Sequence, residues 1–431
     1  MSKPKETALD DLDFSDFVRA GDGVVWGQLS SEPIPLSQQL LSQRQSIGRF
    51  SVFLGATFSE SANADYADVV NFRGIGGIGN NRKLERAGVL DIIPTQLSSI
   101  PIYFSGGQIR SDVALVQMTE EDDGGYGFAV GSDYIVAAVQ QARIVIGEVN
   151  AQAPRTFGPH RIPREKIACL VRTDRPVLSV AAAKVGPLEE KIARFASEYI
   201  PDGAVLQVGI GAVPEAIMAQ LNDRRNLGVH SGMIGDSVAD LVEAGVITNA
   251  LKPFNQGLTV TGMLAGTERL YRFANRNPAL TMRSLDCTHD AGLLASIPRL
   301  ISINSAVEVD LTGQVNAEEV GGRHLGAVGG AVDYVRGAHR APGGRSIIAM
   351  PSTAGEGKIS RVVARLAGPV STSRSDVDLI VTEYGAADLR GRSLAQRAQA
   401  MIAIAHPDHQ EALSRAVHEQ FKGGQEIYGC N

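Results

Sequence analysis

The sequence contains few cysteines and few aromatic residues. Three of its 431 residues are cysteine, and aromatic residues make up 5% of the chain. Cys169, Cys287 and Cys430 lie far apart and lack metal-site spacing, so we expect free thiols in a reducing cytosol. The low aromatic content argues mildly against a ligand pocket built on aromatic stacking.

Long apolar runs and blocks of like charge are also absent. No run reaches the roughly 18 apolar residues that suggest a membrane span. The opening MSKPKETALDDLDF is acidic and lacks the apolar core of a signal peptide. The net charge of −6 is spread along the chain. The sequence therefore predicts a cytoplasmic protein that binds neither a membrane nor nucleic acid.

Short apolar runs alternate with polar helical stretches through most of the chain. Such runs are typical of strands buried on both faces, and they occupy residues 112–118, 143–150, 203–211, 345–352 and 378–385. Between two of them, a helix is predicted from Pro187, with Leu188, Ile192, Phe195 and Tyr199 on one face. The alternation predicts an α/β fold of open, mainly parallel sheets flanked by helices.

A poorly periodic stretch, VRTDRPVLSVAAAKVG (171–186), separates the two halves of this pattern. We place a domain boundary near residue 185, which gives two α/β domains, 1–185 and 186–431. The length of the chain also favours more than one domain. We expect the active site to lie in the cleft between these two domains.

Two glycine-rich segments follow predicted strands and precede helices. In LQVGIGAVPEAI, Gly209 and Gly211 could let a ligand approach the backbone at a helix N-terminus, although a tight turn explains them equally well. Pro214 replaces the third glycine of a dinucleotide fingerprint, which makes a dehydrogenase a weaker alternative. In GAVGGAVDY, Gly329 and Gly330 precede a helix expected near residue 333 and could supply oxyanion-hole amides, or form a flexible turn.

Charged residues follow other predicted strands. Glu383 ends the strand in DLIVTEYG, and Glu60 follows a strand expected to end at Phe58. Ligands of open α/β sheets gather at such strand ends, although a helix cap or a loop carboxylate is an ordinary alternative. Lys358 and Arg361, in STAGEGKISR, could bind a phosphate or belong to a solvated loop.

Taken together, these segments are far more specific than any one of them. The order VGIGAVPEAI, HSGMIGDSVADLVEAGVITN, SINSAVEVDLTGQVNAE, GAVGGAVDYVRGA, SIIAMPSTA and VTEYGAADLRGRSLAQRA resembles the acetyl-CoA hydrolase/transferase family. This class I CoA-transferase group includes 4-hydroxybutyrate and succinyl-CoA:acetate CoA-transferases. The resemblance is strong from about residue 200 to 410 and weaker before that.

The resemblance implies ping-pong transfer of coenzyme A between an acyl-CoA and a small carboxylate, through an enzyme glutamate. Coenzyme A would be a substrate, with no permanently bound cofactor or metal, and the enzyme would be a homodimer. The resemblance places an assisting glutamate on Glu383, an assisting asparagine on His289 and the nucleophilic glutamate on Gly232. It places the oxyanion donors on two glycine-rich segments, namely Gly209, Gly211, Ala212 and Val213, and Gly330 with its neighbour Gly329.

Glycine at position 232 leaves three hypotheses for the chemistry. In the first, the opposing domain supplies the nucleophile through Glu60; some bacterial branches of the family, itaconate-type transferases among them, use an N-terminal glutamate. In the second, the chain is a thioester hydrolase with Glu383 or His289 as general base. In the third, it binds acyl-CoA without turnover.

Further residues complete the candidate list. Glu308, Glu318 and Glu319 are weaker nucleophile candidates in a predicted strand and turn, and we interpret them as structural or substrate-contacting. Arg73 and Arg82 could grip the far end of a dicarboxylate acceptor, or be ordinary surface arginines.

Overall fold

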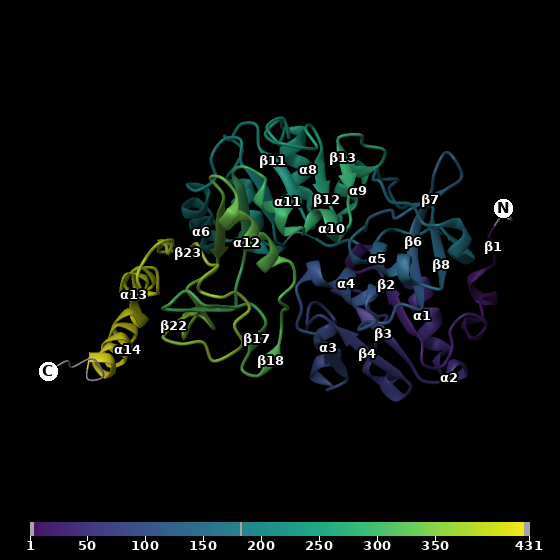
Figure 1. Ribbon diagram of the computed structural model, residues 1–431, viewed down its shortest axis with the longest axis horizontal. Helices are drawn as coiled ribbons and strands as arrows, with labels where there is room; N and C mark the ends of the chain where they lie inside the picture. Colours follow the sequence, from purple (N-terminus) through teal and green to yellow (C-terminus); the bar gives the residue numbers. More distant parts are fainter. Residues whose placement is uncertain (1–3, 182, 426–431) are drawn as a thin grey trace.

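The chain forms two lobes, each built around one large sheet (Figure 1). The computed structural model describes residues 4–181 and 183–425. The first sheet has the strand order β1-β9-β8-β6-β2-β3-β4-β5, with β7 beside β6. Its strands are β1 Lys5–Glu6, β2 Gly23–Trp26, β3 Phe50–Leu54, β4 Val70–Gly74, β5 Leu90–Ile92, β6 Val113–Glu120, β7 Tyr126–Gly127, β8 Ile144–Asn150 and β9 Ile167–Thr173. All pairs except β6 with β7 are parallel.

The second sheet has the order β13-β12-β11-β10-β14-β19-β23-β24. Its strands are β10 Val205–Val208, β11 Gly228–Ser231, β12 Thr259–Thr261, β13 Leu280–Met282, β14 Leu300–Asn304, β19 Arg345–Ala349, β23 Leu379–Thr382 and β24 Gly385–Asp388. Only the β23–β24 pair is antiparallel. The predicted α/β architecture of mainly parallel sheets is therefore confirmed.

Helices flank both large sheets, and the chain also forms smaller sheets of two or three short strands. The first lobe carries α1 Ile34–Ser42, α2 Arg44–Ile47, α3 Asn81–Arg86, α4 Ile100–Ser105 and α5 Tyr134–Gln141, and the second carries α6 Pro187–Ser197, α7 Ala212–Ala219, α8 Asp236–Glu243, α9 Glu268–Ala274, α10 Leu285–Thr288, α11 Ala291–Ala295 and α12 Ala331–Arg340. Small sheets pair β15 Glu308–Asp310 with β16 Val315–Asn316 and β22 Val362–Val363, β17 Glu319–Val320 with β18 Arg323–His324, and β20 Thr353–Ala354 with β21 Ile359–Ser360. The helices α13 Leu394–Ala403 and α14 Pro407–Gln425 extend away from the second lobe (Figure 1).

In both sheets the chain reverses its direction of growth at a central strand pair. In the second sheet it moves outward from β10 through β11, β12 and β13, and then returns to place β14 on the other side of β10. The first sheet reverses in the same way between β2 and β6. Ligands of open α/β sheets bind outside the carboxyl ends of the strands at such a reversal.

The carboxyl edges of the two sheets face each other across the lobe interface. Ser132 donates its amide to Gly262 O at 2.8 Å, and Gly77 donates to Gly326 O at 3.2 Å. Ser30, which follows β2, donates its hydroxyl to Leu264 O. The segments that follow β2, β4 and β12 therefore lie at the same interface.

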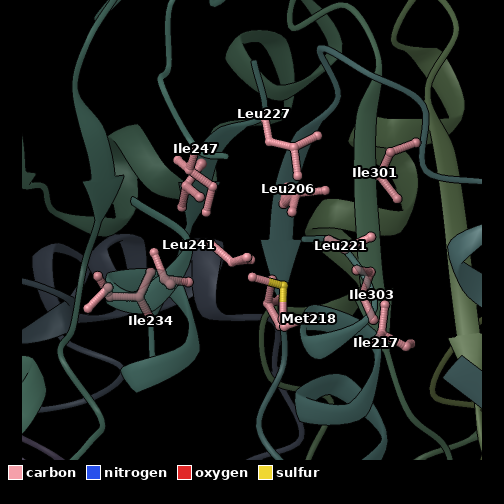
Figure 2. Packing of buried hydrophobic residues seen from close by; sticks show 14 of the residues in the cluster. Leu206, Ile217, Met218, Leu221, Leu227, Ile234, Leu241, Ile247, Ile301 and Ile303 are labelled. Atoms are coloured by element: carbon pink, nitrogen blue, oxygen red, sulfur yellow. The ribbon is translucent and has the colours of Figure 1, made fainter. Parts of the chain in front are cut away.

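Apolar packing fixes α7 against the second sheet. Figure 2 shows Ile217 and Met218 of α7 beside Leu206 of β10 and the β14 side chains Ile301 and Ile303. All five are fully buried. Burying an aliphatic side chain of this size contributes about 1.5–3 kcal/mol. This packing holds the N-terminus of α7 at the carboxyl end of β10.

Some local expectations were wrong. Leu188 of α6 is 39% exposed and does not join the predicted apolar face, whereas Ile192 is buried and Phe195 and Tyr199 pack partly buried against the same core. Strand β3 ends at Leu54 rather than Phe58. It ends there because the amides of the next two residues donate to side chains, Gly55 to Tyr134 Oη at 3.2 Å and Ala56 to Gln28 Oε1 at 2.9 Å.

The two described cysteines, Cys169 and Cys287, are free, and Cys430 lies outside the described residues. Within residues 4–181 and 183–425, no helix has the length and apolar character that a membrane span needs.

Candidate active site

A row of five residues, three of them candidates from the sequence, lines the carboxyl edge of the second sheet. The adjacent strands β11, β10, β14, β19 and β23 lead into Gly232, Gly209, Asn304, Ser352 and Glu383, respectively. Neighbouring strands lie about 4.8 Å apart, so the row spans roughly 19 Å from the first strand to the last. This edge can therefore contact an extended ligand at several points.

The structure brings three of the candidates together: Gly232, His289 and Gly330. A methyl group built on Gly232 would lie 2.6 Å from Cε1 of His289. One built on Gly330 would lie 2.3 Å from Nε2 of the same ring. Carbon atoms do not approach this closely, so the imidazole fills the space that side chains at both glycines would need. Gly232 is therefore closed to a carboxylate while His289 keeps this position.

His289 is held in place by its neighbours and is 2% exposed. Its Nδ1 lies 2.8 Å from the Thr288 hydroxyl oxygen. Its ring meets the ring of Tyr334 edge to face, with 4.9 Å between centroids. Burial lowers the pKa of His289 to about 3, because a charged imidazole would lose its hydration there. The ring is neutral at pH 7.

The loop after β10 presents backbone rather than side chains. Gly209 donates its amide to Ile303 O at 2.9 Å, and Gly211 adopts a φ of +127°, which favours glycine. Ala212 and Val213 form the first turn of α7. Because the Val213 side chain is buried in the core, that position can contribute only its amide to a ligand.

The first lobe holds the start of α12, where Gly329 and Gly330 lie. Leu97 donates its amide to Gly329 O at 3.1 Å. Ser98 donates its hydroxyl and its amide to the Asp333 carboxylate, at 2.6 and 3.2 Å. The sequence did not identify Ser98 or Asp333 as site residues. The only signal for Asp333 was its position as an acidic residue in the first turn of a predicted helix.

Glu60 lies in the loop after β3, with its side chain 69% exposed. Its carboxylate oxygens accept from Lys83 Nζ at 2.7 and 2.6 Å and from Asn80 Nδ2 at 3.1 Å. The same helix, α3, reaches the second lobe, because Arg82 Nη2 donates to Leu325 O at 3.2 Å. Glu60 therefore lies beside the helix that touches the segment leading into Gly329, although no contact in the described residues joins it to His289 or Glu383.

Glu383 forms a separate group at the end of β23. Ser352 donates its amide to one carboxylate oxygen at 2.8 Å and its hydroxyl to the other at 2.6 Å. Burial lowers the pKa of the nearby Arg361, and the charge of Glu383 opposes that shift. Both oxygens of Glu383 thus have a fixed orientation before any substrate binds. The sequence did not identify Ser352 as the residue that holds them.

The remaining candidates lie outside these groups. Lys358 is exposed and lies 3.7 Å from Glu356 in the β20–β21 hairpin. Arg73 lies 3.6 Å from Asp91, in a separate cavity of about 690 Å³ that Arg110 also lines.

The three weaker nucleophile candidates lie in or beside the small strands: Glu308 in β15, Glu319 in β17, and Glu318 immediately before β17. Glu308 accepts from Asn316 Nδ2 at 3.1 Å, and Glu318 accepts from the Ser371 hydroxyl at 2.6 Å. Glu319 pairs with His324 across β17 and β18. These contacts tie the small strands to their neighbours.

Solved structures with this fold are known. RipA from Yersinia pestis superposes with a TM-score of 0.92 at 30% identity, over 97% of this chain and 98% of the other. A 4-hydroxybutyrate CoA-transferase from Porphyromonas gingivalis gives 0.82 at 32% identity, over 96% and 98% of the two chains.

Sequence comparison gives the family. A 4-hydroxybutyrate coenzyme A transferase of Clostridium kluyveri is 42% identical over 80% of this chain and 81% of its own length. A succinyl-CoA:acetate/propanoyl-CoA:succinate CoA transferase of Fasciola hepatica is 36% identical over 80% and 73%. The N-terminal and C-terminal domains of acetyl-CoA hydrolase/transferase match residues 11–181 and 266–417, respectively. The chain therefore belongs to the acetyl-CoA hydrolase/transferase family.

Proposed function

We propose that this protein is a CoA-transferase that moves coenzyme A from a short acyl-CoA to a small carboxylate, with Glu60 as its nucleophile. CoA transfer is supported by the names of relatives that match most of the chain. The observation that carries the choice of nucleophile is the imidazole against Gly232, which leaves no room for a carboxylate there. Glu60 is a loop carboxylate of the facing lobe, and Lys83 and Asn80 hold its oxygens.

The first half-reaction forms two covalent intermediates. A Glu60 oxygen attacks the thioester carbonyl, and the tetrahedral oxyanion collapses to expel the CoA thiolate, which leaves an acyl-glutamyl anhydride. The thiolate then attacks the glutamyl carbonyl of this anhydride. The acyl group leaves as a free carboxylate, and a glutamyl-CoA thioester remains on the enzyme.

The second half-reaction reverses these steps with the acceptor. The acceptor carboxylate attacks the glutamyl-CoA thioester, and the CoA thiolate leaves as a new anhydride forms. The thiolate attacks the acceptor's carbonyl, which gives the product acyl-CoA and returns Glu60 as a free carboxylate. No net proton, electron or water is consumed.

Each tetrahedral oxyanion needs hydrogen-bond donors at the place where its charge develops. In this proposal the amides of Gly211 to Val213 and of Gly330 supply them, because the Gly209 amide is already donated to Ile303 O. Glu383 acts as the assisting carboxylate, with its orientation fixed by Ser352. Contacts of distant parts of CoA would contribute binding energy that orients the thioester.

Hydrolysis is a weaker proposal on chemical grounds. A general base works best when its pKa lies near the working pH. Burial lowers the pKa of His289 to about 3, so this ring would accept a proton from water poorly at pH 7. Of the two bases considered for hydrolysis, only Glu383 then keeps that role.

Mass spectrometry tests the proposed nucleophile. We expect incubation with succinyl-CoA or acetyl-CoA, without acceptor, to add CoA to the intact protein. Borohydride reduction and peptide mapping should then place the modification on Glu60. Glu60→Ala should abolish the adduct and lower kcat by at least about a thousandfold, because the covalent route is lost.

Glu356→Ala is the matched control, because it removes another exposed carboxylate that is paired with a lysine. It should keep both the adduct and the rate. An adduct on a different residue would refute Glu60 as nucleophile, and release of free CoA without any adduct would favour hydrolysis.

A further inference from the structure

Glu60 lies between two buried serines. Ser59 and Ser61 are 6% and 3% exposed, whereas the Glu60 side chain is 69% exposed. The Ser61 amide donates to Ser59 Oγ at 3.2 Å, and the two hydroxyl oxygens lie 3.1 Å apart. The backbone therefore directs residues 59 and 61 into the lobe and residue 60 toward solvent. An anchor on the two serines fixes the place at which the Glu60 side chain leaves the backbone.

Both serines bond to the carboxylate of Glu32, a residue that is 1% exposed. Ser59 donates its hydroxyl to Oε2 at 2.7 Å, and the Ser61 side chain bonds to the same carboxylate. Ser37 of α1 donates to Oε1 at 2.9 Å. Burial raises the pKa of Glu32, and the hydrogen bonds from these serines oppose that shift. One buried carboxylate thus joins the loop that carries Glu60 to α1.

The segment that carries Glu32 is also fixed on its other sides. Gln117 Nε2 and Arg175 Nη2 donate to Glu32 O at 3.3 and 3.2 Å. Two positions earlier, Ser30 donates its hydroxyl to Leu264 O of the second lobe. Contacts therefore run from the second lobe, which holds the proposed oxyanion donors, through this segment to the loop after β3.

A buried carboxylate at position 32 is costly for the fold. Removing a carboxylate from water costs free energy even when its hydrogen bonds are made, and apolar residues of similar volume often replace buried charges without loss of stability. Core packing alone would therefore be served by a leucine at this position. A carboxylate differs from leucine because its two oxygens accept several hydroxyl protons at once.

We propose that Glu32 is a positioning residue, which holds Ser59 and Ser61 so that the carboxylate of Glu60 faces the acyl thioester bound at the second lobe. The inference rests on the proposed role of Glu60 as nucleophile. Glu32 does not touch the substrate in this role, because it acts through the two serines. A reacting group misplaced by about 1 Å can lower the rate about a hundredfold, so the anchoring of this loop affects the rate directly.

Two substitutions test Glu32 as a hydrogen-bond acceptor. Glu32→Leu removes both oxygens, and we expect the CoA adduct on Glu60 to form about 10-fold to 100-fold more slowly, with the KM for acyl-CoA within about threefold of its original value. Glu32→Gln keeps one acceptor, which can face Ser59 while Ser37 donates to Ile34 O, so most of the rate should return.

Asp310→Leu is the matched control. Asp310 is a buried carboxylate outside the site, and it accepts the Thr312 hydroxyl at 2.7 Å. Its replacement should lower the free energy of unfolding and leave the adduct rate unchanged. An adduct rate in Glu32→Leu within about twofold of the unchanged protein would overturn the proposal, and so would a raised KM with an unchanged rate.

Should Glu32→Leu fold poorly, the anchors can be removed from the loop side by combining Ser59→Ala with Ser61→Ala. An unchanged adduct rate in that variant would also overturn the proposal. The outcomes are distinct from those of the proposed nucleophile. Peptide mapping of the unchanged protein decides whether Glu60 carries the adduct, and an adduct elsewhere refutes the nucleophile and this inference with it. An adduct on Glu60 that forms at the same rate without the Glu32 carboxylate refutes only the positioning role.

Discussion

At the scale of single residues, the two departures from the family pattern explain each other. Gly232 stands where the resemblance places the nucleophile, and His289 stands where it places an asparagine. The built methyl group at 232 collides with the His289 ring. A carboxylate at 232 and an imidazole at 289 therefore exclude each other, so neither substitution is neutral by itself.

A mutant cycle tests this exclusion. Gly232→Glu forces a side chain into occupied space, and we expect it to destabilise the protein by about 1–3 kcal/mol. Removing the ring with His289→Ala in the same chain should relieve much of that loss. Urea unfolding of the two single variants and the double variant measures the coupling, and simple additivity would mean that the two residues do not share this space.

At the scale of elements, α12 is the piece that joins the lobes at the site. Ser98 of the first lobe donates twice to Asp333 in the first turn of this helix. The position of the Gly330 amide thus depends on the first lobe. Because Asp333 is largely buried, its pKa is raised from 3.8 to about 6, despite these hydrogen bonds and the charge of Arg336.

The raised pKa of Asp333 predicts a pH trend. The Asp333 carboxyl binds its proton more tightly in the folded protein than in the unfolded chain. Its contribution to the free energy of unfolding is therefore complete below about pH 4 and is lost as the pH rises through 6. Asp333→Asn keeps the shape without the charge. Between pH 4.5 and 7.5, the free energy of unfolding of the wild type should fall by about 1–3 kcal/mol relative to that of this variant, as measured by urea unfolding.

Asp10→Asn serves as the control for this comparison, since Asp10 is exposed. Its stability curve should run parallel to that of the wild type. A parallel curve for Asp333→Asn as well would mean that the buried carboxyl at the lobe junction keeps an ordinary pKa.

At the scale of the whole molecule, buried neutral histidines set the response to acid. Burial lowers the pKa values of His230 and His289 to about 3, and Lys252 also opposes protonation of His230. In the unfolded chain each would titrate near 6.5. Their stability contribution is therefore complete above pH 6.5 and is lost as the pH falls through 3.

We expect the thermal midpoint of the second lobe to fall between pH 6.5 and 4.5. Over this range the two histidines together lower the free energy of unfolding by a few kcal/mol, and protonation of Asp333 partly offsets this loss. Calorimetry should show separate transitions if the lobes unfold independently. Replacing His230 and His289 by glutamine should flatten the trend, and a slope unchanged by both substitutions would assign acid sensitivity to other groups.

Much of the architecture follows from local patterns in the sequence. The apolar runs predicted β6, β8, β10, β19 and β23, because a strand buried on both faces needs continuous apolar residues. The glycines at 209, 211, 329 and 330 stand at strand-to-helix turns, where Gly211 and Gly329 have positive φ. The end of β3 was misplaced, because side chains from distant residues capture its next amides.

By itself, the sequence determined the fold class, the family and the absence of a carboxylate at 232, since each depends on residue type and local order. Tertiary structure decided which residues meet. It placed His289 between two glycines, fixed Glu383 with Ser352, and joined Ser98 to Asp333 across 235 positions of the chain. Such contacts depend on how whole sheets and helices pack, and no local preference of the chain specifies them.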